Sequence, residues 1–270
     1  MDFPSLSARL LTDPPGVIDA PASCDPHVVV HVGPSVKIEC KRGGKTHRGT
    51  AIHGDVDIVP AHTESRWTIW ESDTALIVRI PRHLLTNAAQ ESGVDAAKAQ
   101  LVNRFQIRDP QVEQLAWALK AEMDSNYESG RLYLDSLGTA LASRLVHRHS
   151  SISRTKTTGS KGGLPGAKLR LVLGYIEDNL GNSLSLPEIA AASGLSVSHC
   201  QRAFRQSLGV SVHRYVIGRR VERAESLLAQ EKLSIAQIAL EVGFSHQSHL
   251  ATHMRRLRGL TPSRKRQMAR

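Results

Sequence analysis

The period of hydrophobic and polar positions changes along the chain, and these changes predict where its elements lie. Between about residues 27 and 85, short β-branched runs alternate with breaks that contain glycine, proline or aspartate, which favours an antiparallel sheet or barrel. These runs are His27–Val32, Val36–Glu39, Val56–Val59 and Ala75–Ile80. Residues 1–26 are rich in proline, serine and aspartate, so we expect irregular structure at the start of the chain.

From Gln111 to His149 apolar residues recur every three or four positions, which predicts two consecutive amphipathic helices. The two stripes are Val112, Leu115, Ala116, Leu119, Met123 and Leu132, Leu134, Leu137, Ala140, Leu141, Leu145. Such faces must be buried, either against the sheet or against a second subunit. Residues 150–165 are polar and contain several glycines and serines, which indicates a flexible linker. We therefore expect an N-terminal domain over 1–149 and a C-terminal domain over 166–270.

The C-terminal domain is predicted to be helical throughout and contains an internal repeat. It begins with an amphipathic helix whose apolar stripe ends at Leu180, before Gly181. Residues then match at an offset of 49, and one extra residue in the second copy makes the offset 50. The matched pairs are Ser185/Ser234, Leu186/Ile235, Glu188/Gln237, Ile189/Ile238, Ala190/Ala239, Gly194/Gly243, Leu195/Phe244, Ser196/Ser245, Cys200/Leu250, Phe204/Met254, Arg205/Arg255 and Gly209/Gly259.

The repeated residues are those that a helix, a tight turn and a second helix require. Ser185 with Glu188, and Ser234 with Gln237, are typical of capping boxes. Gly194 and Gly243, in the predicted turns, suit a left-handed backbone. Ser196 and Ser245 are expected to cap the second helices. We therefore predict two helix-turn-helix units, at about 186–207 and 234–257.

Residues 167–269 resemble the DNA-binding domain of the AraC/XylS family of bacterial transcription regulators. The resemblance lies in 233–250 (LSIAQIALEVGFSHQSHL), in 220–228 (RVERAESLL) and in Thr261-Pro262-Ser263. It implies seven helices, with a long helix from Val212 to about Ala229 joining the two units. The chain departs from the family pattern at three positions, Cys200, Thr252 and Lys265, where leucine, arginine and tyrosine are usual. The second unit is therefore expected to read bases less directly than the first.

The outward faces of the two recognition helices supply the candidate DNA contacts. Cys200, Ala203 and Phe204 are expected to face the core, so the positions between them face outward. Arg202 could pair with guanine and Gln201 with adenine, and Arg205 is expected on phosphate. The candidates are Ser198, His199, Gln201, Arg202, Arg205, Gln247, Ser248, His249, Thr252, His253, Arg255 and Arg256. A packed position remains the alternative for His199 and His249.

The charge distribution agrees with a polyanionic partner for the C-terminal domain. The chain carries a formal charge of +10, of which +9 lies in residues 165–270. A localised basic field favours nucleic acid, because each neutralised phosphate releases counterions. A basic, solvated surface without such a partner is the alternative.

The segment Thr50–His62, followed by Trp67 and Trp70, resembles the cupin-like barrels that precede many AraC-type domains. That resemblance implies a small-molecule effector and a homodimer through the helices of residues 111–149. His53, His62, Trp67 and Trp70 are the candidate effector residues, with core or surface roles as the alternative. The barrel lacks the His-X-His element of metal-binding cupins, although His147 and His149 show this spacing on a predicted helix. We therefore expect no metal and no cofactor.

The expected fold class is α+β, with a cupin-like barrel and helical hairpin followed by an all-α double helix-turn-helix domain. The expected function is sequence-specific regulation of promoter DNA, as activator or repressor, with RNA polymerase as a partner if the chain activates. The sequence contains no apolar stretch of 18 residues and no signal peptide, which predicts a cytoplasmic protein without membrane contact. Two enzyme classes are alternatives, a cupin-type metalloenzyme and an alkyl-transfer repair protein. No catalytic motif is found, and neither Cys24 nor Cys40 has the Pro-Cys-His-Arg context of alkyl transfer, so we predict no enzyme activity.

Overall fold

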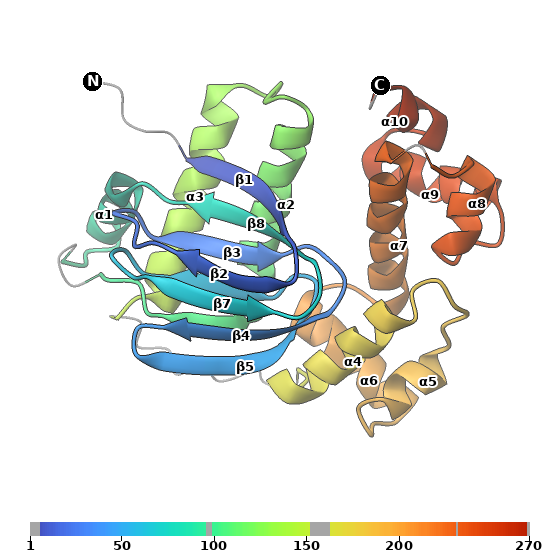
Figure 1. Cartoon of the computed structure of the whole chain (residues 1–270), viewed down its shortest axis with the longest axis horizontal. Coiled ribbons are helices and arrows are strands. Elements are labelled where there is room, and N and C mark those ends of the chain that lie inside the picture. The colour runs from blue at the N-terminus through green and yellow to red at the C-terminus, as the bar shows by residue number, and fades with distance from the viewer. Residues whose placement is uncertain (1–5, 96–98, 152–162, 231, 269–270) are drawn as a thin grey trace. The chain divides into compact units, whose positions relative to one another are not determined.

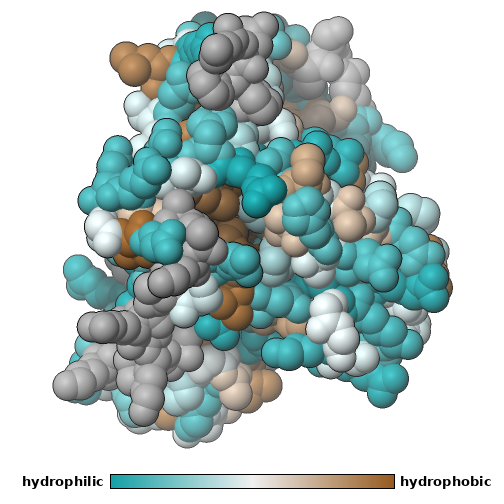
Figure 2. Space-filling view, turned by 90° about the vertical axis from the view of Figure 1, so that its left-hand side faces the viewer, coloured by the Kyte–Doolittle hydropathy of each residue, from teal (hydrophilic) through white to brown (hydrophobic). Residues whose placement is uncertain are grey.

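The computed structural model of the chain describes four stretches, residues 6–95, 99–151, 163–230 and 232–268. The chain divides into two compact units, Met1–Thr158 and Gly159–Arg270 (Figure 1). Most of the linker predicted over 150–165 falls on residues 152–162, which lie outside the described residues. The face shown in Figure 2 is mostly hydrophilic, with hydrophobic side chains in small separate areas.

The N-terminal unit contains two antiparallel sheets. One sheet has the order β1 (Ser7–Asp13), β8 (Asp73–Arg79), β3 (His27–His31), β6 (Val56–Val59) and β9 (Arg104–Ile107). The other has the order β2 (Gly16–Ala20), β7 (Ser65–Ile69), β4 (Val36–Arg42) and β5 (Lys45–Ala51). The expected α+β class is confirmed, and the strands form two open sheets rather than one closed barrel.

Strands β1 and β2 correct the expectation of irregular structure over residues 1–26. Ser7 pairs with Arg79 and Asp13 with Asp73, so β1 is held along its whole length by β8. Every residue of β1 and β2 is exposed or half-buried, because each strand lies at the edge of its sheet. Edge strands of this kind need no apolar run, and the hydrophobic pattern therefore gave no signal for them.

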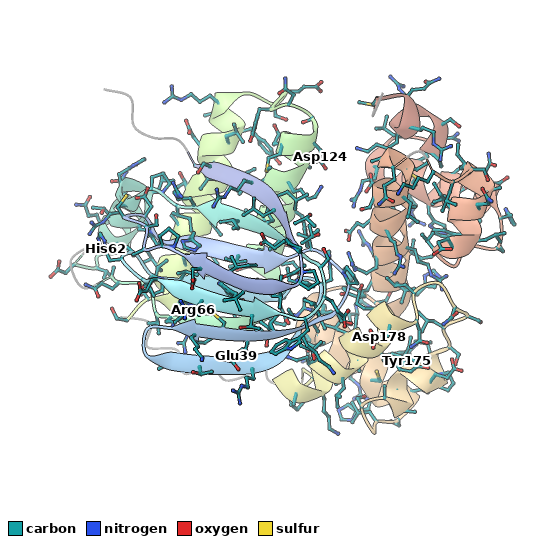
Figure 3. All side chains as sticks on the ribbon, viewed as in Figure 1. Glu39, His62, Arg66, Asp124, Tyr175 and Asp178 are labelled. Atoms are coloured by element: carbon teal, nitrogen blue, oxygen red, sulfur yellow. The ribbon has the colours of Figure 1, made fainter. Side chains whose placement is uncertain are left out.

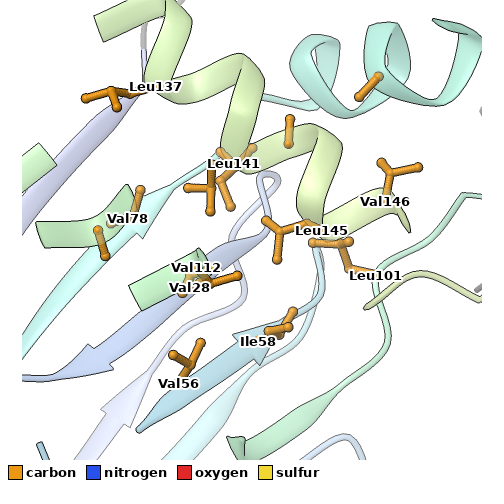
Figure 4. Packing of buried hydrophobic residues seen from close by; sticks show 14 of the residues in the cluster. Val28, Val56, Ile58, Val78, Leu101, Val112, Leu137, Leu141, Leu145 and Val146 are labelled. Atoms are coloured by element: carbon orange, nitrogen blue, oxygen red, sulfur yellow. The ribbon is translucent and has the colours of Figure 1, made fainter. Parts of the chain in front are cut away.

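The predicted helical hairpin packs onto the five-stranded sheet. The described part of this unit has three helices. Helix α1 (Arg82–Glu91) lies between β8 and β9 in the chain, and α2 (Pro110–Asp124) and α3 (Arg131–His149) follow β9. Leu137, Leu141 and Leu145 of α3 join one core cluster with Val28 and Val78 of the sheet (Figure 4). The apolar stripes are therefore largely buried inside the unit.

A buried carboxylate links the two hairpin helices. Asp109 caps α2 by accepting hydrogen bonds from the backbone nitrogens of Gln111 and Val112. Its carboxylate also accepts hydrogen bonds from Arg144 (Nε to Oδ2, 2.9 Å) and from His149 (2.8 Å) on α3. Burial opposes ionisation of this carboxyl, but the hydrogen bonds from His149 and Arg144 outweigh it and hold its pKa well below the usual range.

The C-terminal unit is helical throughout its described residues. Its helices are α4 (Gly166–Asp178), α5 (Leu186–Ala191), α6 (Val197–Leu208), α7 (Val212–Ala229), α8 (Ile235–Glu241), α9 (Gln247–Arg258) and α10 (Pro262–Met268). Val221, Ala224 and Leu228 of α7 pack with Ile238 of α8 and Met254 of α9 in one core cluster. Among the described helices of the chain, none is both long and apolar enough to cross a membrane.

Candidate nucleic-acid interface

The first helix-turn-helix unit is built by α5, a turn at Gly194, and α6. Ser185 and Glu188 form a capping box at the start of α5, with a backbone nitrogen of each bonded to the other's side chain. Gly194 has φ +64°, a left-handed conformation that costs a glycine little. Ser196 then occupies the N-cap of α6, although its side chain makes no capping hydrogen bond.

Helix α6 has one buried face and one exposed face. Cys200, Ala203 and Phe204 are buried, as the sequence pattern predicts. The side chains of the five candidate contacts in this unit are all exposed, and they are Ser198, His199, Gln201, Arg202 and Arg205. The helix therefore presents a polar, basic face that the unit's own core does not use.

The second unit repeats this arrangement with a different start to its recognition helix. Ser234 and Gln237 form a capping box at α8, and Gly243 in the turn has φ +88°. Helix α9 is capped by His246, whose side chain accepts a hydrogen bond from the backbone nitrogen of His249. This corrects the expectation that Ser245 is the N-cap, because the extra residue of the second copy shifts the helix start by one position.

The candidate contacts on α9 divide by exposure into an exposed group and a half-buried group. The exposed group is Gln247, Ser248, Thr252, Arg255 and Arg256. The hydroxyl of Thr252 donates to the backbone oxygen of Ser248 at 2.9 Å, which leaves it less available to a base.

His249 and His253 are half-buried against Phe244. The ring of Phe244 lies edge-on to His249 at 5.2 Å and stacks on His253 at 5.7 Å. Burial, with the positive field of His249, His213 and Arg256, lowers the pKa of His253. These two imidazoles are thus partly packed, whereas His199 on α6 is exposed.

The arginines of the two recognition helices differ in whether they form hydrogen bonds or ion pairs within the protein. The side chains of Arg202, Arg205, Arg255 and Arg256 make no hydrogen bond or ion pair to any other described residue. Arg258, at the end of α9, is instead bound by two carboxylates of α7. Its Nε lies 3.1 Å from Glu225 and its Nη2 lies 3.3 Å from Glu222. The free arginines are the ones available to phosphate or bases.

Two adjacent arginines on α7 hold the C-terminal unit together, and the sequence pattern did not single them out. Arg219 is buried and pairs with the buried Glu177 of α4, with Nε 2.7 Å from Oε1 and Nη2 3.0 Å from Oε2. Arg220 donates to three backbone oxygens, of Leu180 at 3.0 Å, Gly243 at 2.8 Å and Asn182 at 2.8 Å. These bonds tie the end of α4 and the turn of the second unit to the joining helix.

In the N-terminal unit the four candidate effector residues lie in different surroundings. His53 is buried, bonds the backbone oxygen of Val32 at 2.7 Å and stacks on Trp117 at 4.8 Å. Trp67 is half-buried on β7. His62 is exposed in the loop between β6 and β7 (Figure 3), and the side chain of Trp70 is 54% exposed.

The N-terminal unit also buries a polar cluster that the sequence did not reveal. Arg42 is fully buried and bonds Asp57 at 3.0 Å and Asn103 at 2.8 Å. Its guanidinium lies 4.3 Å from the ring centre of Phe105 and 5.7 Å from that of Trp67. In the sequence Arg42 precedes a Gly-Gly turn in a charged segment, where an exposed side chain is the ordinary expectation.

The chain is similar to known regulators over its C-terminal unit. A family described as a helix-turn-helix domain matches residues 189–268. AarP of Providencia stuartii, an HTH-type transcriptional activator, is 37% identical over 92 residues, which cover 34% of this chain and 68% of AarP. The protein named "probable transcriptional regulator LumQ" of Photobacterium leiognathi is 33% identical over 99 residues, which cover 36% of this chain and 40% of LumQ.

A solved structure is also similar to a part of the chain. It is a transcriptional regulator from Chromobacterium violaceum, described as containing an AraC-type DNA-binding domain. Its sequence is 34% identical, and the match covers 38% of this chain and 92% of that one, with a TM-score of 0.37.

Proposed function

This chain belongs to the AraC/XylS family of transcription regulators, and we propose that it binds promoter DNA sequence-specifically through α6 and α9. The observation that carries the proposal is the pair of helix-turn-helix units, each with an exposed polar face on its second helix. An exposed recognition helix of this kind fits the major groove of duplex DNA. The charge of residues 165–270, +9, supports a polyanionic partner.

Within this proposal the two recognition helices have unequal roles. Helix α6 reads bases through Gln201 and Arg202, because both side chains are exposed and amide and guanidinium groups pair with adenine and guanine. Helix α9 holds phosphates through Arg255 and Arg256, since the hydroxyl of Thr252 is bonded within the helix. The remaining candidates on the two faces are Ser198, His199, Arg205, Gln247, Ser248, His249 and His253.

Helix α7, which joins the two helix-turn-helix units, sets the distance between the two recognition helices on DNA. Because α7 connects the two units in one chain, the recognition helices would enter successive major grooves, roughly 34 Å apart on one face of the duplex. One subunit then covers an asymmetric site, so the C-terminal unit itself needs no palindrome. The bonds of Arg219 and Arg220 support a rigid connection.

Replacing Arg202 by alanine is expected to relax base preference at one position of the bound sequence. The loss should be about 1–3 kcal/mol of binding free energy on the preferred base and much less on the other three. The measurement is fluorescence anisotropy of the full chain on duplexes substituted one base pair at a time. Arg205→Ala is the matched control, because a phosphate contact should weaken binding to all these duplexes equally. If Arg202→Ala also weakens all of them equally, Arg202 does not read a base.

We further propose that residues 1–149 bind a small effector and form a homodimer through residues 111–149. A polar ligand is supported by Nη1 of the fully buried Arg42, which has no hydrogen-bond partner among the described residues. An interface is supported by Leu132 and Tyr133 at the start of α3, which are 82% and 42% exposed. Thermal-shift screening of small molecules tests the first role, and a monomer mass in sedimentation velocity would contradict the second.

We infer that the chain acts as a regulator and not as an enzyme, with RNA polymerase as a further partner if it activates. The relatives reported above are named as regulators. Burial raises the pKa of the Cys40 thiol to about 12, which opposes the thiolate that alkyl transfer requires. Burial also raises the pKa of Cys200, which packs in the core of the first helix-turn-helix unit. A regulator accounts for the double unit, whereas neither enzyme class requires it.

A further inference from the structure

Three histidines gather at the start of the second recognition helix. His246, His249 and His253 lie in the turn and the first two turns of α9, and the last two contact Phe244. His246 already has a task, because its Nδ1 accepts the capping hydrogen bond from the backbone nitrogen of His249 at 3.2 Å. The Nε2 atoms of His249 and His253 lie 3.1 Å apart and share a hydrogen bond, in which one ring is the donor and the other the acceptor.

We propose that His249 and His253 chelate a divalent transition-metal ion of the Zn²⁺, Ni²⁺ or Cu²⁺ class. Zinc binds imidazole nitrogen at about 2.0–2.1 Å. Two nitrogens at that distance from one ion are about 2.9 Å apart at a right angle and about 3.4 Å apart at the tetrahedral angle. The observed separation of 3.1 Å lies between these two values. A metal ion would replace the proton of this hydrogen bond, and rotation of the two rings would then direct both lone pairs at the ion.

The surroundings of the pair favour chelation. Residues four apart lie on the same face of a helix, so both ligands come from one rigid element. Phe244 stacks on His253 and meets His249 edge-on, which limits the ring orientations that a metal ion would have to fix. The Oγ of Ser245 lies 3.3 Å from Nδ1 of His249. A partner at Nδ1 orients a ligating imidazole and leaves Nε2 for the ion.

The proposed metal site leaves coordination positions free for water, and its imidazole ligands select among metal ions. Over residues 6–95, 99–151, 163–230 and 232–268 no group of three or more His, Cys, Asp or Glu side chains is placed to hold a metal. Water would therefore complete the coordination, as expected for a site that binds and releases its ion. Imidazole nitrogen favours zinc, copper and nickel, whereas magnesium prefers oxygen ligands, so Mg²⁺ should not bind here.

The first helix-turn-helix unit lacks this pair and supplies an internal control. His199 of α6 is the counterpart of His249 at the repeat offset of 50, but Ala203 stands where the second copy has His253. His199 is exposed, so its removal takes away one imidazole without removing a chelate. A metal site at His249 and His253 departs from the expectation of a protein without metal, which considered the N-terminal barrel. It also goes beyond the proposed DNA binding, and its test needs no DNA.

The test is isothermal titration of ZnCl₂ into the full chain without an affinity tag, with Cys24→Ser in every sample to remove the exposed thiol. The parent should bind one equivalent of Zn²⁺ and give no heat with MgCl₂. His249→Ala and His253→Ala should each weaken this binding by more than about tenfold, since even loss of a ligand's hydrogen-bond partner costs about that much. His199→Ala should leave it unchanged. Equal Zn²⁺ affinity in the parent and in His253→Ala would overturn the proposal.

A second measurement separates loss of the ligand from loss of the fold. His253 packs on Phe244, so His253→Gln, which keeps more of the side-chain volume than alanine, is compared by circular dichroism to establish that α9 is intact. Electron paramagnetic resonance of the Cu²⁺-loaded chain should show two nitrogen ligands in the parent and one in His253→Gln. Two nitrogens in both proteins would contradict chelation by this pair.

Discussion

Replacing Glu177 by glutamine is expected to lower the free energy of unfolding of the C-terminal unit by about 3 kcal/mol or more. The change removes the negative charge from the two hydrogen bonds to Arg219, at 2.7 and 3.0 Å, and keeps the side-chain volume. Arg219 is 7% exposed and cannot lose its proton. Its positive charge therefore stays buried without the negative charge of Glu177 to balance it. Urea unfolding of the full chain, followed by hydrogen exchange of peptides from α4 and α7, measures the loss.

Glu222→Gln is the matched control for this prediction. Glu222 also contacts Arg219, but its side chain is 30% exposed, so water replaces part of the lost interaction. Its replacement should cost about 1 kcal/mol or less. A double replacement of Glu177 and Arg219 by methionine should recover part of the stability, since an apolar pair leaves no buried charge. Equal losses for Glu177→Gln and Glu222→Gln would mean that the buried pair does not hold α4 to α7.

The two turn glycines are expected to respond differently to alanine, although they are equivalent in the repeat. At Gly194 an added Cβ meets nothing within 4 Å, so only the left-handed backbone is strained, at a cost of about 1–2 kcal/mol. At Gly243 the Cβ would lie 2.5 Å from the backbone oxygen of Leu180 and 2.8 Å from the guanidinium of Arg220. Overpacking of this kind adds about 1–3 kcal/mol, so Gly243→Ala should cost about 2–5 kcal/mol in total.

The measurement is urea unfolding of both variants by circular dichroism at 222 nm. Gly194→Ala serves as the control for backbone strain, because its φ of +64° is also left-handed. Gly243→Ala should in addition disturb the hydrogen bond from Arg220 to the oxygen of residue 243, which helps to tie the second unit to α7. A loss at Gly243 no larger than the loss at Gly194 would show that the turn can move away from Leu180 without cost.

The sequence predicted the C-terminal unit well because local chemistry repeats there. Capping boxes at Ser185 and Ser234, and left-handed glycines at 194 and 243, are set by residues within one turn of each other. The start of α9 was predicted at the wrong residue. A histidine can cap a helix as serine does, and only the backbone path shows that His246 takes this position.

Contacts between distant residues could not be predicted in the same way. The pair of Arg219 and Glu177 joins residues 42 positions apart, and nothing in the local pattern distinguishes this arginine from those that face solvent. Arg42 was missed for the same reason, since its partners on β6 and before β9 are far along the chain. The edge strand β1 gave no hydrophobic signal, because backbone pairing with β8 rather than burial defines it.

The most direct test of DNA binding by the exposed faces of α6 and α9 is selection of bound sequences from random duplex DNA by the full chain at moderate salt. We expect an asymmetric site with a strongly preferred segment read by α6, and a weakly preferred segment at α9 about one helical turn, or about 10 base pairs, away on the same face of the duplex. Arg202→Ala should lose the preference at one base-pair position of the segment read by α6 and retain it at the other positions. Recovery of sequences with no preference at all, at the same salt concentration, would contradict the proposal that α6 and α9 read DNA.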